Sequence, residues 1–124
     1  MNYLIVFLGG GLGAAARLGV NVNAARLVGI AFPYGTLFIN VTGSFVMGLI
    51  GGYFALKGQA SQEVRMFLTT GILGGYTTFS AFSMETAMLY ERGEVAASAT
   101  YAVASVALSV GALFAGLAVV RAIV

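Results

Sequence analysis

The chain contains no cysteine and no histidine, and only four of its 124 residues are acidic. Without cysteine it can form no disulfide and has no thiolate nucleophile. Without histidine it lacks the usual proton shuttle, and these two residue types together supply most transition-metal ligands in proteins. Four carboxylates leave little for paired acid–base catalysis. We therefore expect no enzyme, and the net charge of +2 gives no reason to expect nucleic acid as a partner.

Charge of either sign is scarce, whereas apolar residues dominate. Charged residues make up 8% of the chain and hydrophobic residues 60%, whereas a soluble domain carries about a quarter charged residues. This composition predicts one all-α integral membrane domain, residues 1–124, surrounded by membrane lipid. We expect the N-terminal apolar run to span rather than to be cleaved as a signal peptide, because no Lys or Arg precedes it. The predicted spans are residues 3–20, 34–56, 64–89 and 95–120, with turns at 57–63 and 91–94.

The third predicted span has a polar interruption at residues 74–82. A glycine pair loosens a helix, and backbone groups freed in this way cannot remain unsatisfied in lipid. We therefore expect the third helix to be broken at mid-membrane, where protein or a polar pathway surrounds the break. Either the freed carbonyls of residues 74–77 coordinate a cation, or neighbouring hydroxyls recapture them. The interruption consists of Gly74, Gly75, Tyr76, Thr77, Thr78, Phe79, Ser80, Ala81 and Phe82.

Asn40 and two phenylalanines are candidates for contact with an anion. The Asn40 carboxamide lies within the second span and must find partners there, so it either joins helices or offers its N–H donors to an anion. Phe79 and Phe82 are three residues apart and share one face of a helix. Their rings could pack or face lipid, or they could turn their electropositive edges toward an anion.

A polar stripe follows the fourth span, because Tyr101, Ser105 and Ser109 are spaced four residues apart. It forms a polar track unless the serines bond to their own helix backbone. Glu85 is either within a span, where carboxylates are usually functional, or at the interface, solvated or paired with an arginine. Arg17, at the end of the first span, either extends to the headgroups or draws anions into a vestibule.

Positive charges are balanced between the two sides of the predicted membrane domain. Three of them fall on the side of the termini and three on the other. Because a Lys/Arg excess normally sets orientation, this tie favours insertion in both orientations over one fixed orientation set by weak local cues. Opposed copies could then pair into an antiparallel dual-topology homodimer. The glycines of the first two spans predict close helix packing. The two charge sets are Lys57, Arg65 and Arg121, and Arg17, Arg26 and Arg92.

Three blocks of the sequence resemble the Fluc fluoride-channel family, over the first three spans. The third block is highly specific, whereas the glycine-rich first block alone would be weak. Ala81 departs from the family pattern, in which threonine is common at this position. The blocks are Gly9-Gly10-Gly11-Leu12-Gly13-Ala14 with Arg17; Gly35-Thr36 with Asn40, Gly43-Ser44-Phe45 and Gly48; and Gly71 with Gly74-Gly75-Tyr76-Thr77-Thr78-Phe79-Ser80-Ala81-Phe82-Ser83-Met84-Glu85.

The resemblance implies an antiparallel homodimer with two pores that exports fluoride passively and selectively across the cell membrane. It implies a structural sodium ion at the dimer centre, held by the backbone carbonyls of Gly74 and Thr77. It further implies fluoride contact at Asn40, Phe79 and Phe82. The remaining residues expected on or near the pathway are Thr78, Ser80, Tyr101, Ser105, Ser109, Glu85 and Arg17.

Two other functions remain open from the sequence. A small dual-topology drug/proton antiporter also has four spans, but it needs a carboxylate in its first span, and residues 3–20 contain none. A membrane subunit without transport activity would explain the glycines, but not Asn40, the phenylalanine pair or the balance of charges.

Overall fold

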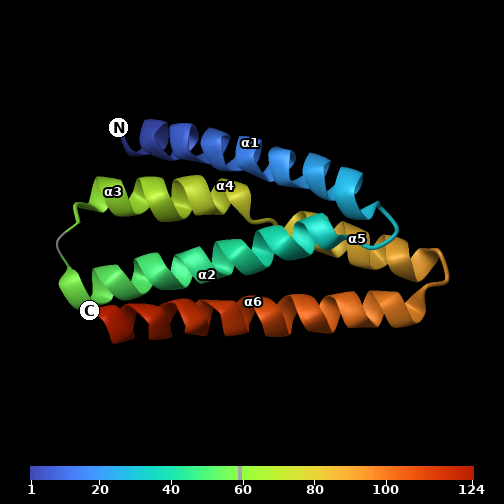
Figure 1. Cartoon of the computed structure of the whole chain (residues 1–124). Helices are drawn as coiled ribbons and strands as arrows, with labels where there is room; N and C mark the ends of the chain where they lie inside the picture. Colours follow the sequence, from blue (N-terminus) through green and yellow to red (C-terminus); the bar gives the residue numbers. More distant parts are fainter. Residues whose placement is uncertain (59) are drawn as a thin grey trace.

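The computed structural model describes residues 1–58 and 60–124, and throughout these residues the regular structure is helical (Figure 1). Four segments run antiparallel, the third of them composed of several short helices. The all-α architecture is therefore confirmed. The elements are α1 (Asn2–Val28), α2 (Tyr34–Lys57), α3 (Gln62–Met66), the π-helix η1 (Phe67–Leu73), α4 (Gly74–Tyr76), α5 (Phe79–Glu91) and α6 (Val95–Ile123).

Within the described part of the chain, three helices (α1, α2 and α6) are long and apolar enough to cross a membrane. Helix α1 continues past the predicted end of the first span to Val28, and Asn23 within this extension donates to the Gly19 carbonyl at 2.8 Å. Hydropathy detects residues compatible with lipid, whereas the helix continues until Gly29 adopts a positive φ of 82°. The predicted turn at 91–94 is confirmed by Gly93, at φ 84°. Of the predicted turn at 57–63, Gln59 lies outside the described residues.

Glycines set the distances between the helices. A Cβ atom at Gly13 of α1 would overlap the Ile72 carbonyl of η1, and one at Gly48 of α2 would overlap the Leu113 carbonyl of α6. The structure thus forms two tight pairs, α1 with η1–α4 and α2 with α6 (Figure 1). The prediction of glycine packing is confirmed at these positions, whereas Gly11 and Gly51 meet open space.

The third segment is broken where it was expected to be, but the two glycines do not break it. Gly74 and Gly75 are helical, and a Cβ on Gly75 would overlap the Gly10 carbonyl of α1. The close packing that this permits outweighs the intrinsic flexibility of glycine. The extended residues are Thr77 (φ −80°, ψ 157°) and Thr78 (φ −153°, ψ 117°). The predicted break is therefore present, but the prediction that the glycine pair causes it is wrong.

The break changes the packing partner of the third segment. Before it, η1 and α4 lie against α1; after it, α5 lies against α6 (Figure 1). The two termini lie at one end of the bundle, and the α1–α2 loop and the α5–α6 turn lie at the other. Arg17 lies within α1 rather than at its end. When it is left out of the count, three positive side chains remain at the end of the bundle with the termini and two at the other end.

Candidate functional site

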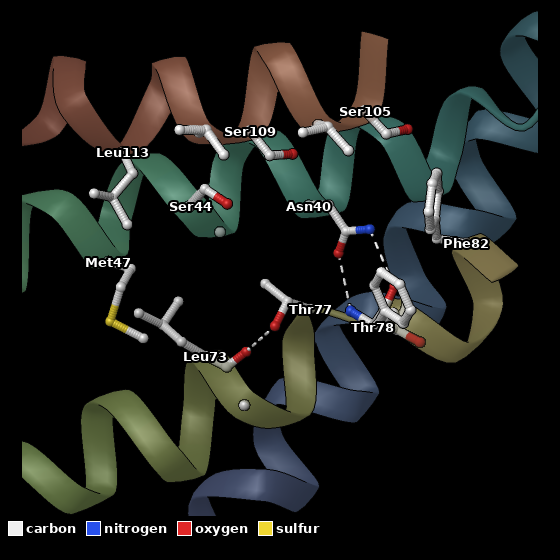
Figure 2. Close-up of a pocket in the computed structure, with 15 residues that line it drawn as sticks. Asn40, Ser44, Met47, Leu73, Thr77, Thr78, Phe82, Ser105, Ser109 and Leu113 are labelled. Carbon is white, nitrogen blue, oxygen red and sulfur yellow. Dashed lines mark hydrogen bonds between the residues drawn. The ribbon is translucent and has the colours of Figure 1, made fainter. Parts of the chain in front are cut away.

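A pair of hydrogen bonds from α2 holds the break open. The Thr78 amide donates to Asn40 Oδ1 at 2.9 Å, and Asn40 Nδ2 donates to the Thr78 carbonyl at 3.1 Å (Figure 2). The carboxamide therefore replaces both helical partners of one extended residue. This is the helix-joining role considered for Asn40. One Nδ2 hydrogen remains beyond the one donated to Thr78.

At the break, the amides that would be the helical donors of two backbone carbonyls bond elsewhere. In a continuous helix the Gly74 carbonyl would accept from the Thr78 amide, which instead donates to Asn40. The Thr77 carbonyl would accept from the Ala81 amide, which instead donates to Thr78 Oγ1 at 3.1 Å and caps α5. The Thr77 hydroxyl recaptures neither carbonyl, because it donates to the Leu73 carbonyl at 2.8 Å, which keeps its own helical donor, the Thr77 amide, at 2.9 Å.

A cavity of about 370 Å³ lies between the break and the α2–α6 pair (Figure 2). Asn40, Thr77 and Thr78 contribute its polar wall on the side of the break. Phe79 and Phe82 line it from α5, and Phe79 is 77% exposed where the cavity opens at the surface of the chain. Among the described residues, the lining combines hydroxyl, amide, aromatic and aliphatic groups and includes no charged side chain.

Two serines of α6 point unpartnered hydroxyls toward this cavity. The Oγ atoms of Ser105 and Ser109 are buried, and neither has a hydrogen-bond partner among the residues that the structure describes. Several other helical hydroxyls bond to the preceding turn, as Thr86 does to the Phe82 carbonyl at 2.8 Å. A buried hydroxyl without a partner is costly, so each such group in a native structure requires an explanation. A polar species passing through the cavity would supply the missing partner.

Aromatic rings connect this cavity to the next polar cluster along α5 and α6. The Phe79 and Phe82 ring centroids are 5.4 Å apart, and Phe82 is 5.3 Å from Tyr101. The expectation that the two phenylalanines share a face is confirmed. Tyr101 is completely buried, and its hydroxyl donates to Glu85 Oε1 at 3.0 Å.

Glu85 is held by side chains of two other helices, α2 and α6. Thr36 donates to its second carboxylate oxygen, Oε2, at 3.0 Å. Both oxygens therefore accept a hydrogen bond from a neutral hydroxyl. Glu85 and Thr36 line a second cavity of about 540 Å³ beside the α1–α2 loop. Tyr101 thus links Phe82, which lines the first cavity, to Glu85, which lines the second.

Comparison with known proteins places the chain in a family. The profile described as "CrcB-like protein, Camphor Resistance (CrcB)" matches residues 4–117. The chain belongs to this family. A "Fluoride-specific ion channel FluC" of Rhodopseudomonas palustris is 65% identical over 123 residues, covering 99% of each chain. "Fluoride-specific ion channel FluC 2" of Nitrobacter hamburgensis is 63% identical over 121 residues, covering 98% of each. A "Fluoride-specific ion channel FluC" of Granulibacter bethesdensis is 59% identical over 124 residues, covering all of this chain and 98% of that protein.

The match to the CrcB-like family agrees with the membrane-length helices, and the chain is a multi-pass protein of the cell membrane. The resemblance seen in the sequence is confirmed over nearly the whole chain. The names of these relatives describe ion channels, not enzymes.

Four of the predicted site residues of this CrcB-like chain lie outside the cavity at the break: Tyr101 and Glu85, described above, and Arg17 and Ser80. Arg17 Nε donates to the Gly75 carbonyl at 3.1 Å, on the α1 side of the break, and so lies at the height of the break rather than at a helix end. Ser80 is exposed at the start of α5, with Oγ 3.3 Å from Thr78 Oγ1. Neither side chain is among the described residues that line the two cavities.

The sequence reasoning missed two contributors to the site. Thr36 was noted only as a neighbour of Asn40, yet it binds Glu85 across 49 positions of sequence. Phe32, beside the only proline, packs its ring on Tyr101 with centroids 5.5 Å apart. An aromatic residue directly before the proline that opens the second span was the available signal for Phe32.

Proposed function

We propose that this chain forms a fluoride-selective channel that lets fluoride leave the cell passively. The relatives named as fluoride-specific ion channels support the choice of ion. The observation that carries the proposal is the pair of buried Ser105 and Ser109 hydroxyls, which find no hydrogen-bond partner among the described residues and lie beside a cavity whose described lining carries no charge. A dehydrated anion in that cavity would accept their hydrogen bonds.

Selectivity follows from replacing the water of a small, strongly hydrated anion with weak donors. The Asn40 amide, the two serine hydroxyls and the phenylalanine ring edges each offer a partial positive charge. Conduction requires binding that is strong enough for entry and weak enough for release. None of the described residues that line the cavity is positively charged, so none of them would trap the ion. Arg17 lies on the far side of the break and donates to a carbonyl there.

The path continues from the cavity at the break past Phe82 and Tyr101 to the second cavity. The Phe82 ring touches Tyr101, and the Tyr101 hydroxyl touches Glu85, which lines that second cavity. Fluoride would pass from the serine hydroxyls along the ring edges toward the end of the bundle that carries the α1–α2 loop.

A second, inverted copy would complete the cavity in an antiparallel homodimer with two pores. Phe79 is 77% exposed at the mouth of the cavity, and such a copy would cover it. The positive charges at the two ends, three against two, give little bias toward one orientation. Insertion in both orientations would supply the opposed copies.

A sodium ion fits the carbonyls that the break releases. Gly74 and Thr77 are the residues whose helical donors bond elsewhere, and Gly74 is exposed on the surface of the chain. Hard cations prefer oxygen ligands. Carbonyls from two copies would hold the ion between them and stabilise the dimer.

Efflux from liposomes that contain the purified protein tests the proposal. Fluoride should leave rapidly down its gradient without a proton gradient, whereas chloride should be retained. Equal efflux of the two ions would contradict the proposed selectivity, and absence of fluoride efflux from folded protein would contradict the proposed channel function. Uptake of a cationic dye driven by a pH gradient would instead indicate the drug/proton antiporter.

A further inference from the structure

The loop between α1 and α2 inserts one aromatic side chain into the bundle. Phe32 lies in this loop, directly before the Pro33 that precedes α2. Its ring is 5.5 Å from that of Tyr101 at an interplanar angle of 86°, an edge-to-face contact. It is also 4.9 Å from Tyr34. The two loop-side rings extend the aromatic column that begins at the cavity near the break.

The loop is fixed at the point where Phe32 enters. Arg92 Nη2, from the α5–α6 turn, donates to the Ala31 carbonyl at 3.0 Å. The same atom lies 2.8 Å from Glu94 Oε2, an ion pair that orients the guanidinium. The residue before Phe32 is thus tied to the other connection at this end of the bundle, the α5–α6 turn.

Tyr101 is held between two rings. Phe82 contacts it from α5 at 5.3 Å, and Phe32 contacts it from the loop. A buried ring with two aromatic neighbours has little freedom to turn, so the direction of its hydroxyl is fixed. That hydroxyl occupies one carboxylate oxygen of Glu85, and Thr36 occupies the other.

We propose that Phe32 is a positioning residue of the pathway: it holds the Tyr101 hydroxyl on Glu85 and so keeps the carboxylate out of the passage between the two cavities. The inference rests on the proposed channel function. Glu85 is the acidic residue at this junction, and its charge opposes entry of an anion if the carboxylate turns into the passage. Without the Phe32 ring, Tyr101 can tilt into the space beside the loop and release Glu85.

The test compares Phe32→Leu, Phe32→Tyr and the control Phe38→Leu in fluoride efflux from liposomes, each as purified protein with an unchanged elution volume in size-exclusion chromatography. Phe38 is 56% exposed on the neighbouring helix. We expect Phe32→Leu to slow efflux about tenfold, the scale set by loss of one aromatic pair. Phe32→Tyr should stay within about twofold of the parent, because the ring and its edge contact are kept, and Phe38→Leu should leave the rate unchanged.

A second comparison in the Glu85→Gln background separates positioning from general packing. Phe32→Leu should slow efflux less in that background, because no carboxylate charge remains to be held. An equal effect in both backgrounds would overturn the proposal. If Glu85→Gln alone conducts too slowly to compare, the Phe32→Tyr variant decides: a rate as low as that of Phe32→Leu would overturn it. Absence of efflux by the parent protein would instead contradict the channel function itself.

Discussion

Replacing Asn40 by aspartate changes one atom and reverses the electrostatics of the cavity. Asn40 Nδ2 donates to the Thr78 carbonyl at 3.1 Å, whereas a carboxylate oxygen at that position repels the carbonyl. Losing a donor to a partly buried carbonyl costs about 1–3 kcal/mol of folding stability. The effect on conduction is larger. A carboxylate about 4 Å from a fluoride ion, at an effective dielectric constant of about 20, opposes it by about 4 kcal/mol. Because about 1.4 kcal/mol corresponds to a tenfold change in rate, Asn40→Asp should slow fluoride efflux about a thousandfold.

Asn23→Asp provides a matched control for this prediction. Asn23 also donates its Nδ2 to a backbone carbonyl, that of Gly19 at 2.8 Å, but it is exposed on α1. The same chemical change there should leave efflux near the parent rate. Asn40→Leu removes both hydrogen bonds without adding charge and should be less severe than Asn40→Asp. Folded Asn40→Asp protein that conducts within a few-fold of the parent would refute the placement of Asn40 on the pathway.

Three further outcomes follow from the packing and the cavity. Phe82→Ile should slow fluoride efflux from liposomes more than Phe114→Ile, because Phe114 is 62% exposed on α6, away from the ring column; equal slowing would count against the ring edges. Ser109→Ala should raise the midpoint of thermal unfolding, because it removes a buried hydroxyl whose missing partner costs about 1 kcal/mol or more of folding stability. The same variant should slow fluoride efflux. A lower midpoint would show that the hydroxyl has a partner in the folded protein. Gly13→Ala should destabilise the protein by about 1–3 kcal/mol through overlap with η1, whereas Gly11→Ala, in open space, should leave denaturation unchanged or stabilise it by about 0.5–1 kcal/mol.

Hydropathy was sufficient to predict the segments but not their ends or the cause of the break. Helix α1 extends to Val28 because polar residues remain helical after the apolar run stops. Gly75 is helical because its missing Cβ lets α4 contact Gly10 across the helix interface. Whether a glycine loosens a helix or tightens an interface depends on the facing helix. That helix is more than sixty positions away in the sequence, so the residues around Gly75 alone do not predict the contact.

Residue types and spacing predicted most of the cavity lining, but not the bonds within it. The spacing of two serines at i and i+4 does not tell whether their hydroxyls bond to their own helix or face a cavity. In the structure, Ser105 and Ser109 line the cavity and do not bond to the helix backbone. The bond between Asn40 and Thr78 spans 38 positions. It depends on the register of α2 against the third segment, which no local pattern encodes.

One side chain links the geometry of the break to the chemistry of the cavity. By accepting the Thr78 amide, Asn40 removes the donor of the Gly74 carbonyl, and by donating to Thr78 it fixes the residue whose hydroxyl caps α5. The same carboxamide lines the cavity that Ser105 and Ser109 face. A substitution at this position therefore disturbs the released carbonyls and the anion donors together, whereas Ser109→Ala touches the donors alone. If the sodium ion proposed above binds at the break, it should be lost in Asn40→Leu and retained in Ser109→Ala, although both should conduct slowly. Retention of sodium in Asn40→Leu would separate the cation site from the hydrogen bonds that open the helix.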